Sequence, residues 1–423
     1  MTGKKHQENF ALIEALMALE VTIAALGARG DGVTENGLYV PFTVPGDQVL
    51  VDPVGDRAQL LEIRTAGPYR TDPLCPHFTD CGGCVVQHVT DPEVAAWKTG
   101  VIAASLAARG IKGIEIRPMI TSPPASRRRI SVSARRTRKT VQIGFHAPYS
   151  DRVVPVSACV VARPELIDCF ERLEELISFG ASRKGSIKIA LTMTEGGIDA
   201  AFSEVKEVRG PEQALLAGAA NRAGVARLSW NGDVALTRAS PTVRMGRAQV
   251  TLPPGGFLQA TQEGERALVA SVREAVGVAS RIADLYAGIG TFALPLAEQA
   301  EIRAYEGSAK AAAALDIAWR GTEGLRHVSS EQRDLVRRPL LAVELRGIDA
   351  LVIDPPRAGA RIQCQQIAES DVPRIASVSC NPATFARDAR LLIDAGYRLD
   401  WVQPVDQFRW SAHVELAAQF SKP

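Results

Sequence analysis

The chain has 423 residues, of which 46% are hydrophobic and 23% charged, with a formal net charge of +2. These values exclude a disordered or fibrous protein and fit two or three folded domains. No stretch has the ~20 uninterrupted apolar residues of a membrane helix. No apolar core follows Lys4 and Lys5 at the N-terminus, so we expect a cytoplasmic protein with no membrane partner.

The N-terminal part predicts a short tail followed by a small β-barrel. Residues 1–16 are polar and are assigned to the tail. From Leu19 onward, short apolar and polar alternations are separated by turns at Gly30-Asp31-Gly32 and Asn36-Gly37. Such spacing favours an OB-like barrel over residues 17–70, a fold that often binds RNA.

The middle of the chain, residues 71–255, predicts a mixed α/β domain with a basic stretch. Between Ile116 and Tyr149 there is no acidic residue, which indicates a track for RNA phosphates or, as the alternative, a solvated basic face. The basic side chains of this stretch are Arg117, Arg127, Arg128, Arg129, Arg135, Arg136, Arg138 and Lys139. Pro253-Pro254-Gly255-Gly256 then interrupts any regular structure and marks a domain boundary.

The last part, residues 256–423, predicts a doubly wound parallel sheet. A helical pattern over 261–276 is followed by alternating strand and helix patterns, which is typical of an α/β domain with ligands at the carboxyl ends of its strands. The predicted strands are 282–286, a strand ending at Glu306, 349–353, 376–379, 399–402 and 414–420.

A candidate cofactor site follows the first strands of this domain. Gly288 and Gly290 lie between a strand and a helix, where glycines let the backbone approach a ligand. Glu306 is placed to accept hydrogen bonds from ribose hydroxyls, and Asp334 could serve an adenine, in NAD and in S-adenosylmethionine alike. The stiff segment Asp354-Pro355-Pro356-Arg357 favours S-adenosylmethionine, because a dehydrogenase has no evident use for it.

Two further residues carry candidate chemistry. Cys380 follows the fifth strand, at the same carboxyl edge as Asp354. His413-Val414-Glu415 opens the last strand pattern, and strand alternation predicts His413 and Glu415 on one face. A thiol at this edge is a candidate nucleophile, and a carboxylate in reach of it is a candidate general base.

Four cysteines form a candidate metal site with thiol-only character. Cys75, Cys81 and Cys84 are clustered, and Cys159 lies downstream. The count fits either structural zinc or an iron-sulfur cluster, and the spacing alone does not choose between them.

The motifs around Asp354, Cys380 and Glu415, in this order, resemble those of the RNA 5-methyluridine methyltransferase family. The resemblance extends from about Leu19 to the C-terminus and is strongest to 23S ribosomal RNA enzymes with a TRAM barrel and an iron-sulfur cluster. It implies a Rossmann-like class I methyltransferase domain and methylation of uracil C5 in RNA, with Cys380 as the nucleophile and Glu415 as the base. We expect a monomer. The implied pocket residues are Gln259, Tyr286, Gly288, Gly290, Thr291, Glu306, Asp334 and Asp354.

The resemblance also implies a [4Fe-4S] cluster on Cys75, Cys81, Cys84 and Cys159, and S-adenosylmethionine as the methyl donor. Ala287, Thr261 and Arg409 depart from the family pattern, which bears on pocket detail and target choice. Three alternatives stay open: methylation of the T-loop uridine of transfer RNA, a non-catalytic iron-sulfur RNA-binding protein, and a nicotinamide-dependent oxidoreductase.

Overall fold

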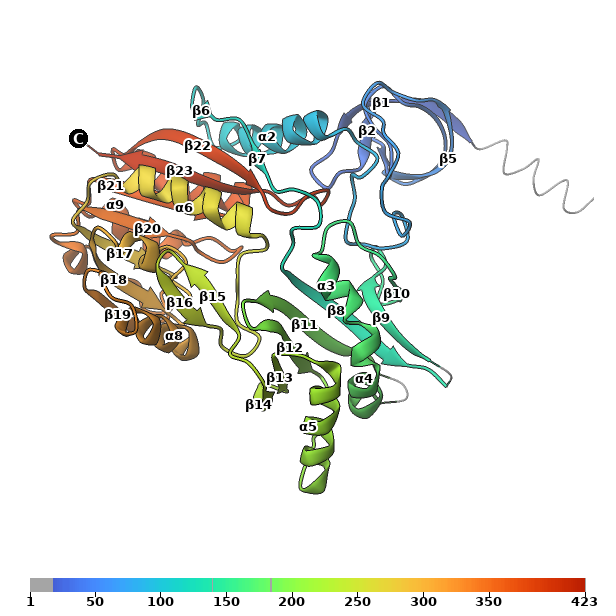
Figure 1. Ribbon diagram of the computed structural model, residues 1–423. Coiled ribbons are helices and arrows are strands. Elements are labelled where there is room, and N and C mark those ends of the chain that lie inside the picture. The colour runs from blue at the N-terminus through green and yellow to red at the C-terminus, as the bar shows by residue number, and fades with distance from the viewer. Residues whose placement is uncertain (1–17, 139, 183–184, 423) are drawn as a thin grey trace, which may run out of the picture. The chain divides into compact units, whose positions relative to one another are not determined.

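The computed structural model describes residues 18–138, 140–182 and 185–422 (Figure 1). The predicted tail and the basic residue Lys139 lie outside these described residues. The chain forms two compact units. The first runs to Val101 and takes in Trp410–Ala412, and the second contains Ile102–Arg409 and the chain from His413 onward. The division of the chain at residues 70 and 255 is not decided by these units and stays a prediction.

The first unit contains a closed barrel of five strands in the order β1-β2-β3-β5-β4, as the turn spacing predicted. Its interior is filled by alternate apolar side chains, which include Ile23, Val40, Val49 and Val51. The strands are β1 (Leu19–Leu26), β2 (Gly32–Thr34), β3 (Tyr39–Val40), β4 (Gln48–Val54) and β5 (Arg57–Thr65). Helix α2 (Asp91–Ala107) then carries the chain from the first unit into the second.

The second unit begins with a seven-stranded sheet in the order β10-β9-β8-β11-β12-β13-β14. Its helices α3 (Pro164–Asp168), α4 (Glu174–Gly180) and α5 (Pro211–Ala223) share an apolar core with the sheet. A buried two-pronged ion pair between Arg227 and Asp199 joins β13 to β12. The strands are β8 (Arg129–Arg136), β9 (Val141–His146), β10 (Val153–Pro155), β11 (Ile187–Thr194), β12 (Gly197–Ser203), β13 (Arg227–Trp230) and β14 (Asp233–Thr237).

A second, nine-stranded sheet follows, in the order β19-β18-β17-β20-β21-β23-β22-β6, with β7 also paired to β22. Strands β17 to β21 are parallel, and β23 runs antiparallel to its neighbours β21 and β22. The strands are β6 (Glu115–Ile116), β7 (Ile120–Thr121), β17 (Arg281–Leu285), β18 (Glu301–Glu306), β19 (Val328–Gln332), β20 (Ala350–Ile353), β21 (Arg374–Ser379), β22 (Arg398–Asp406) and β23 (Glu415–Ser421). A separate hairpin, β15 (Thr242–Met245) and β16 (Ala248–Thr251), comes before strands β17 to β23 of this sheet in the chain.

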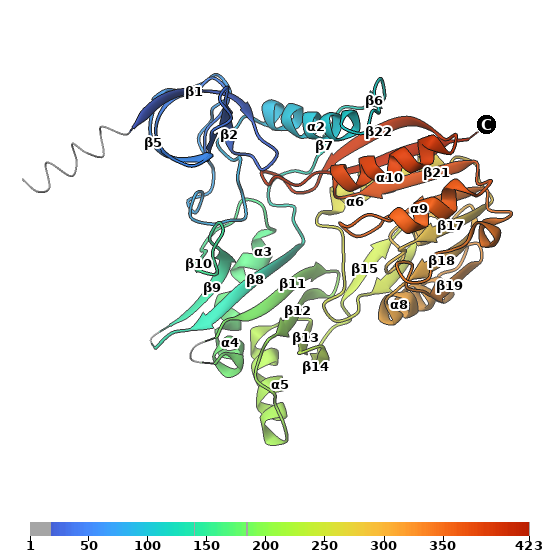
Figure 2. The ribbon, with the colours of Figure 1, turned by 180° about the vertical axis from the view of Figure 1, so that it is seen from behind.

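Helices cover both faces of the nine-stranded sheet, as Figures 1 and 2 show from opposite sides. Successive strand residues face opposite cores: Ile282 packs on the side of α6 and Ala283 on the side of α9 and α10. Thr261 caps the start of α6 by accepting the Gly264 N–H at 3.0 Å. The helices are α6 (Gln262–Val276), α7 (Ala293–Leu296), α8 (Ala309–Arg320), α9 (Arg361–Ala368) and α10 (Pro382–Asp394). The expected doubly wound α/β domain is confirmed.

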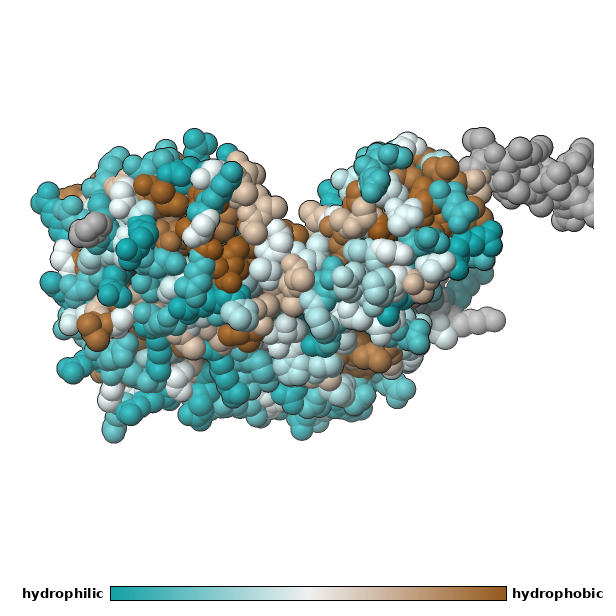
Figure 3. Space-filling model, turned by 90° about the horizontal axis from the view of Figure 1, so that it is seen from above, coloured by the Kyte–Doolittle hydropathy of each residue, from teal (hydrophilic) through white to brown (hydrophobic). Residues whose placement is uncertain are grey.

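The surface drawn in Figure 3 is mostly hydrophilic, with apolar residues gathered in separate patches. Among the described residues, no helix has the length and apolar character needed to cross a membrane.

The order of the strands indicates which edge of the nine-stranded sheet binds a ligand. The strand order reverses between β17 and its neighbours β18 and β20, and in open α/β sheets ligands bind at such a switch point.

Candidate active site

The loop after β17 forms an open backbone turn at the switch point. Tyr286 has a φ of 63°, Gly288 of 58° and Gly290 of 97°. A Cβ added at Gly288 would meet nothing within 4 Å, whereas one at Gly290 would lie 2.8 Å from the Leu294 side chain. The space over Gly288 is therefore available to a ligand, and Gly290 lets the loop pack closely on its own helix. Thr291, in the same loop, is buried.

The two acids predicted for the ribose and adenine occupy different settings. Glu306, at the end of β18, accepts the backbone N–H of Gly288 at 2.8 Å and that of Ser308 at 2.7 Å. This places its carboxylate against the open turn. Asp334 is exposed and accepts the N–H of Val336 at 3.0 Å, so in this structure it caps a turn after β19. Glu306 thus lies where a ribose-binding carboxylate was predicted, whereas the contacts of the Asp334 side chain within the described residues are with Val336 and Arg337.

The loop that follows β20 carries Asp354 and is held by helix α10. The Asp388 carboxylate accepts the Ala360 N–H at 2.8 Å, and Arg387 donates to the carbonyl of Ala358 at 3.0 Å. At the start of α10, the side chains of Asn381 and Thr384 donate to the carbonyl of Arg357 at 3.1 and 3.2 Å. These four contacts fix the Asp354 loop to the helix that begins directly after Cys380.

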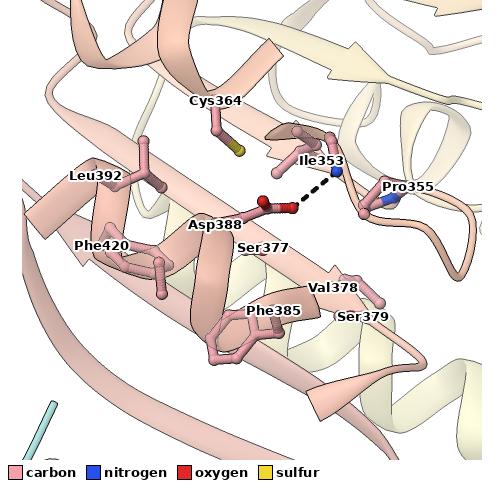
Figure 4. A pocket seen from close by; sticks show the side chains of 13 residues that line it. Ile353, Pro355, Cys364, Ser377, Val378, Ser379, Phe385, Asp388, Leu392 and Phe420 are labelled. Carbon is pink, nitrogen blue, oxygen red and sulfur yellow. Dashed lines mark hydrogen bonds between the residues drawn. The ribbon is translucent and has the colours of Figure 1, made fainter. Parts of the chain in front are cut away.

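A small pocket lies beneath this loop, between β20, β21 and the helices α9 and α10. Figure 4 shows Ile353, Pro355 and Phe385 around it, with Cys364 on one side and Asp388 reaching a backbone nitrogen across it. None of the residues of the Gly288 turn lines it. Burial raises the pKa of the Cys364 thiol far above its usual range. The pocket is therefore an apolar support for the Asp354 loop, with an unreactive thiol.

Cys380, Glu415 and Asp354 meet at the carboxyl edge of the sheet. Burial raises the pKa of the Cys380 thiol, and the negative charges of Glu415 and Asp354 raise it further, while Arg357 lowers it. Burial and Asp354 raise the pKa of Glu415 to about 8, and burial raises that of Asp354 to about 7. The three groups are therefore close enough to influence one another's charge.

The expected pairing of His413 with Glu415 on one strand face is wrong. Strand β23 begins at Glu415, so His413 precedes the strand and strand alternation does not apply to it. His413 is exposed and its Nδ1 lies 2.9 Å from Arg357 Nη2, whereas Glu415 is buried. His413 contributes to the surface beside the Asp354 loop.

Two buried polar residues extend the site beyond the sequence motifs. Asp284, at 0% exposure, makes no hydrogen bond within normal limits among the described residues; the nearby Ala293 N–H offsets only part of the burial that raises its pKa. Gln407, just after β22, donates to Gln259 Oε1 at 2.6 Å and to the Glu415 carboxylate. The sequence pattern carried no signal for Gln407, because its contacts with Gln259 and Ala260 span more than a hundred residues of the chain.

An unpaired acid and an open backbone turn at one edge fit a cationic ligand. S-adenosylmethionine carries a sulfonium and an ammonium group, so the carboxyls of Asp284 and Asp354 match its charge. Of the positions that depart from the family pattern, Thr261 caps α6 and Arg409 donates to the carbonyl of Ser122 at 3.2 Å. Both are structural contacts at the margin of the site.

The four predicted metal ligands are divided between the two units. Cys75, Cys81 and Cys84 belong to the first unit and Cys159 to the second, and all four are half-buried. Phe78, in the same segment, packs against Phe42 of the barrel unit. Within the part of the chain that is described, no three Cys, His, Asp or Glu side chains are close enough to hold a metal ion.

The arginines of the basic stretch differ in their partners and in their exposure to solvent. Arg117 forms two hydrogen bonds with Glu274, and buried Arg128 pairs with Glu265 at 2.5 Å, so neither is available to a phosphate. Arg129 lies over the ring of Phe257 at 5.7 Å, and its pKa is lowered by burial. Exposed cations are thus concentrated at the far end of β8, at Arg135, Arg136 and Arg138.

Comparison with known proteins agrees with this arrangement. Residues 255–422 match the tRNA (Uracil-5-)-methyltransferase family model. An uncharacterised RNA methyltransferase of Brucella suis is 42% identical over 95% of this chain and 98% of its own length. The 23S rRNA (uracil(1939)-C(5))-methyltransferase RlmD of Pectobacterium atrosepticum is 29% identical over 95% of this chain and 93% of its own.

A solved structure shares the fold. The crystal structure of Pyrococcus abyssi tRNA (uracil-54, C5)-methyltransferase in complex with S-adenosyl-L-homocysteine superposes with a TM-score of 0.74 and 23% identity. The match covers 95% of this chain and 99% of that one. The relatives set aside the oxidoreductase and non-catalytic alternatives. The chain belongs to the RNA uracil-C5 methyltransferase family, whose members use S-adenosylmethionine to methylate RNA.

Proposed function

We propose that the protein methylates C5 of a uracil in 23S ribosomal RNA through a covalent bond between Cys380 and C6. The observation that carries this proposal is the meeting of a thiol, Cys380, with a buried carboxyl, Glu415, at the edge where the cofactor turn lies. The uracil ring needs both groups, one on C6 and one near C5, and the fold supplies them from neighbouring strands β21 and β23.

The steps follow from the chemistry of these groups. The Cys380 thiolate adds to C6, which moves electron density to C5 and makes that carbon a nucleophile. S-adenosylmethionine, when bound, supplies the methyl group. Glu415 then takes the C5 proton, and the electron pair of that C–H bond restores the C5–C6 double bond as the C6–S bond breaks. Asp354 accepts the uracil N3–H, which cytosine lacks.

Several residues are assigned to the cofactor by their positions. Gly288, Gly290 and Thr291 form the turn, and Glu306 sits beside it for the ribose. Tyr286 and Asp334 remain assigned to the cofactor only through the family resemblance, as does Gln259. The RNA must present its uracil outside the helical stack to reach these buried groups.

Two classes of RNA are candidates for the target, ribosomal RNA and transfer RNA. The relative RlmD acts on 23S ribosomal RNA, and its match spans 95% of this chain. The Pyrococcus abyssi enzyme, which shares the fold at 23% identity, acts on uracil 54 of transfer RNA. We favour ribosomal RNA because RlmD is 29% identical to this chain, whereas the Pyrococcus abyssi enzyme is 23% identical.

A methyl-transfer assay tests reaction and target together. With labelled S-adenosylmethionine, we expect label on C5 of a 23S uridine and background label on transfer RNA. Cys380→Ala abolishes transfer because no adduct forms. Glu415→Gln lowers kcat by about 10²- to 10⁴-fold and accumulates a Cys380–RNA adduct, because the proton is not removed. Label on transfer RNA alone would replace the target and keep the mechanism.

The charge at the edge makes a prediction about the nucleophile without RNA. Because Asp354 raises the pKa of Cys380 and Arg357 lowers it, Asp354→Asn increases the thiolate fraction at pH 8 and Arg357→Gln decreases it. Iodoacetamide should therefore alkylate Cys380 severalfold faster in the first variant and more slowly in the second, as measured by peptide mass spectrometry. Equal rates in both variants would contradict the convergence of these groups.

We also propose that RNA phosphates lie along the exposed end of β8. Arg135→Glu with Arg136→Glu should weaken RNA binding and reduce the slope of log affinity against log salt by about 0.7 to 0.9 per lost contact. Arg222→Glu is the control, since Arg222 is exposed but paired with Glu175. Equal salt slopes for the wild type and the double variant would remove β8 from the RNA path.

For Cys75, Cys81, Cys84 and Cys159 we propose a [4Fe-4S] cluster rather than zinc. The support is the thiol-only donor set and the resemblance, and no catalytic step involves the cluster. Protein purified without oxygen should contain iron and sulfide and absorb broadly near 400 nm. Cys81→Ser should lose both, while Cys380→Ala, which also removes one thiol, should keep them. Zinc in place of iron would overturn the cluster.

A further inference from the structure

A buried glutamine links the proposed base to the pocket. Gln407 is 1% exposed and follows the last residue of β22. Its Oε1 accepts the backbone N–H of Ala260 at 2.8 Å and that of Thr261 at 3.4 Å. Its Nε2 donates to Gln259 Oε1 at 2.6 Å and to the Glu415 carboxylate.

The direction of this amide is fixed by its neighbours. Backbone N–H groups only donate, so the oxygen of Gln407 must face Ala260 and Thr261, and its nitrogen must then face the two other side chains. Helix α6 packs closely on Gln407 at Gly264, where an added Cβ would lie only 2.7 Å from the Cβ of Gln407. The oxygen of Gln407 accepts two hydrogen bonds, one for each lone pair, and its NH₂ group donates two, one from each N–H.

The contacts have different effects on the two partners. An N–H that donates to a carboxylate stabilises its ionised form, so Gln407 opposes the burial and the Asp354 charge that raise the pKa of Glu415. For Gln259, the bond occupies the carbonyl oxygen. The planar amide of Gln259 is then held with its nitrogen turned away from Gln407.

We propose that Gln407 is a positioning residue that keeps Glu415 ionised and fixed for removal of the C5 proton, and that sets the donor direction of Gln259. This inference rests on the proposed role of Glu415 as the base. The charged and titratable groups around Glu415 are Asp354 after β20 and Cys380 after β21. Arg357 acts on Cys380 and contacts His413.

The first experiment needs no turnover. Met has nearly the length of Gln but no N–H, so Gln407→Met should raise the pKa of Glu415 and leave more of it neutral at pH 8. The neutral acid no longer suppresses the Cys380 thiolate, and alkylation of Cys380 by iodoacetamide should become severalfold faster. In a Glu415→Gln background the same substitution should change nothing, because the charge it acts on is absent.

The control is a second buried glutamine, Gln403, which lies in β22 shortly before Gln407. Gln403 is buried and donates to the carbonyl of Pro118 at 2.7 Å, so Gln403→Met removes a similar bond away from Glu415. It should leave the alkylation rate unchanged. Gln407→Leu offers a second variant, since it also lacks the donor and adds no charge near Cys380, and the rate should move in the same direction. An unchanged rate in both Gln407 variants, or an equal change with and without Glu415, would overturn the proposal.

The second experiment measures turnover on RNA. In Gln407→Met the acidic limb of the kcat profile should move to higher pH, because the base must lose its proton before it acts. The Cys380–RNA adduct should accumulate, and KM for RNA should change little. A uniform loss of kcat at every pH would indicate a merely structural residue. If wild-type protein transferred no methyl group, the proposed function would fail there, while the alkylation cycle would still decide the role of Gln407.

Discussion

The gathering of buried acids at one sheet edge is the constraint on which the rest of the site depends. Asp284, Asp354 and Glu415 all have pKa values raised by burial, and the charge of Asp354 raises the pKa of the other two further. Such groups carry charge at a low free-energy cost only beside a cation or a hydrogen-bond donor. A cationic ligand bound at this edge would offset that cost. The edge is thus suited to a cationic methyl donor, and its charge state governs the Cys380 thiol as well.

Helix α10 ties the reactive loops together. It begins at Pro382, two residues after Cys380, and its first turns hold the Asp354 loop through Asn381 and Asp388. Gly359 is required there, because a Cβ would lie 2.5 Å from Asp388 Oδ2. The spacing of thiol and acid is therefore set by a helix and two strands rather than by the loops themselves, which suits a reaction that needs both groups in register.

The order of strands and helices could be predicted from the sequence because periodicity is local. The parallel sheet places Gly288, Asp354 and Cys380 at one edge, and the start of α6 at Thr261 followed from its pattern. What could not be predicted depends on distant partners. Arg128 was expected on an RNA surface, yet its ion pair is with Glu265, 137 residues away. The cysteines show the same limit, because spacing counts thiols and does not show how near to one another the fold brings them.

The proposed active site is held against the arginines at the start of β8 by backbone and ring contacts. The backbone N–H of Arg128 donates to the carbonyl of Ala260 at 2.9 Å, so the start of β8 is fixed beside the start of α6. Arg127 lies over Phe408, which follows Gln407 in the chain, and Arg129 lies over Phe257, which precedes Gln259. Arginine planes and aromatic rings are surfaces on which unstacked bases bind. Because the proposed catalytic groups would contact only one uracil, the choice among RNA targets would come from such contacts outside the pocket.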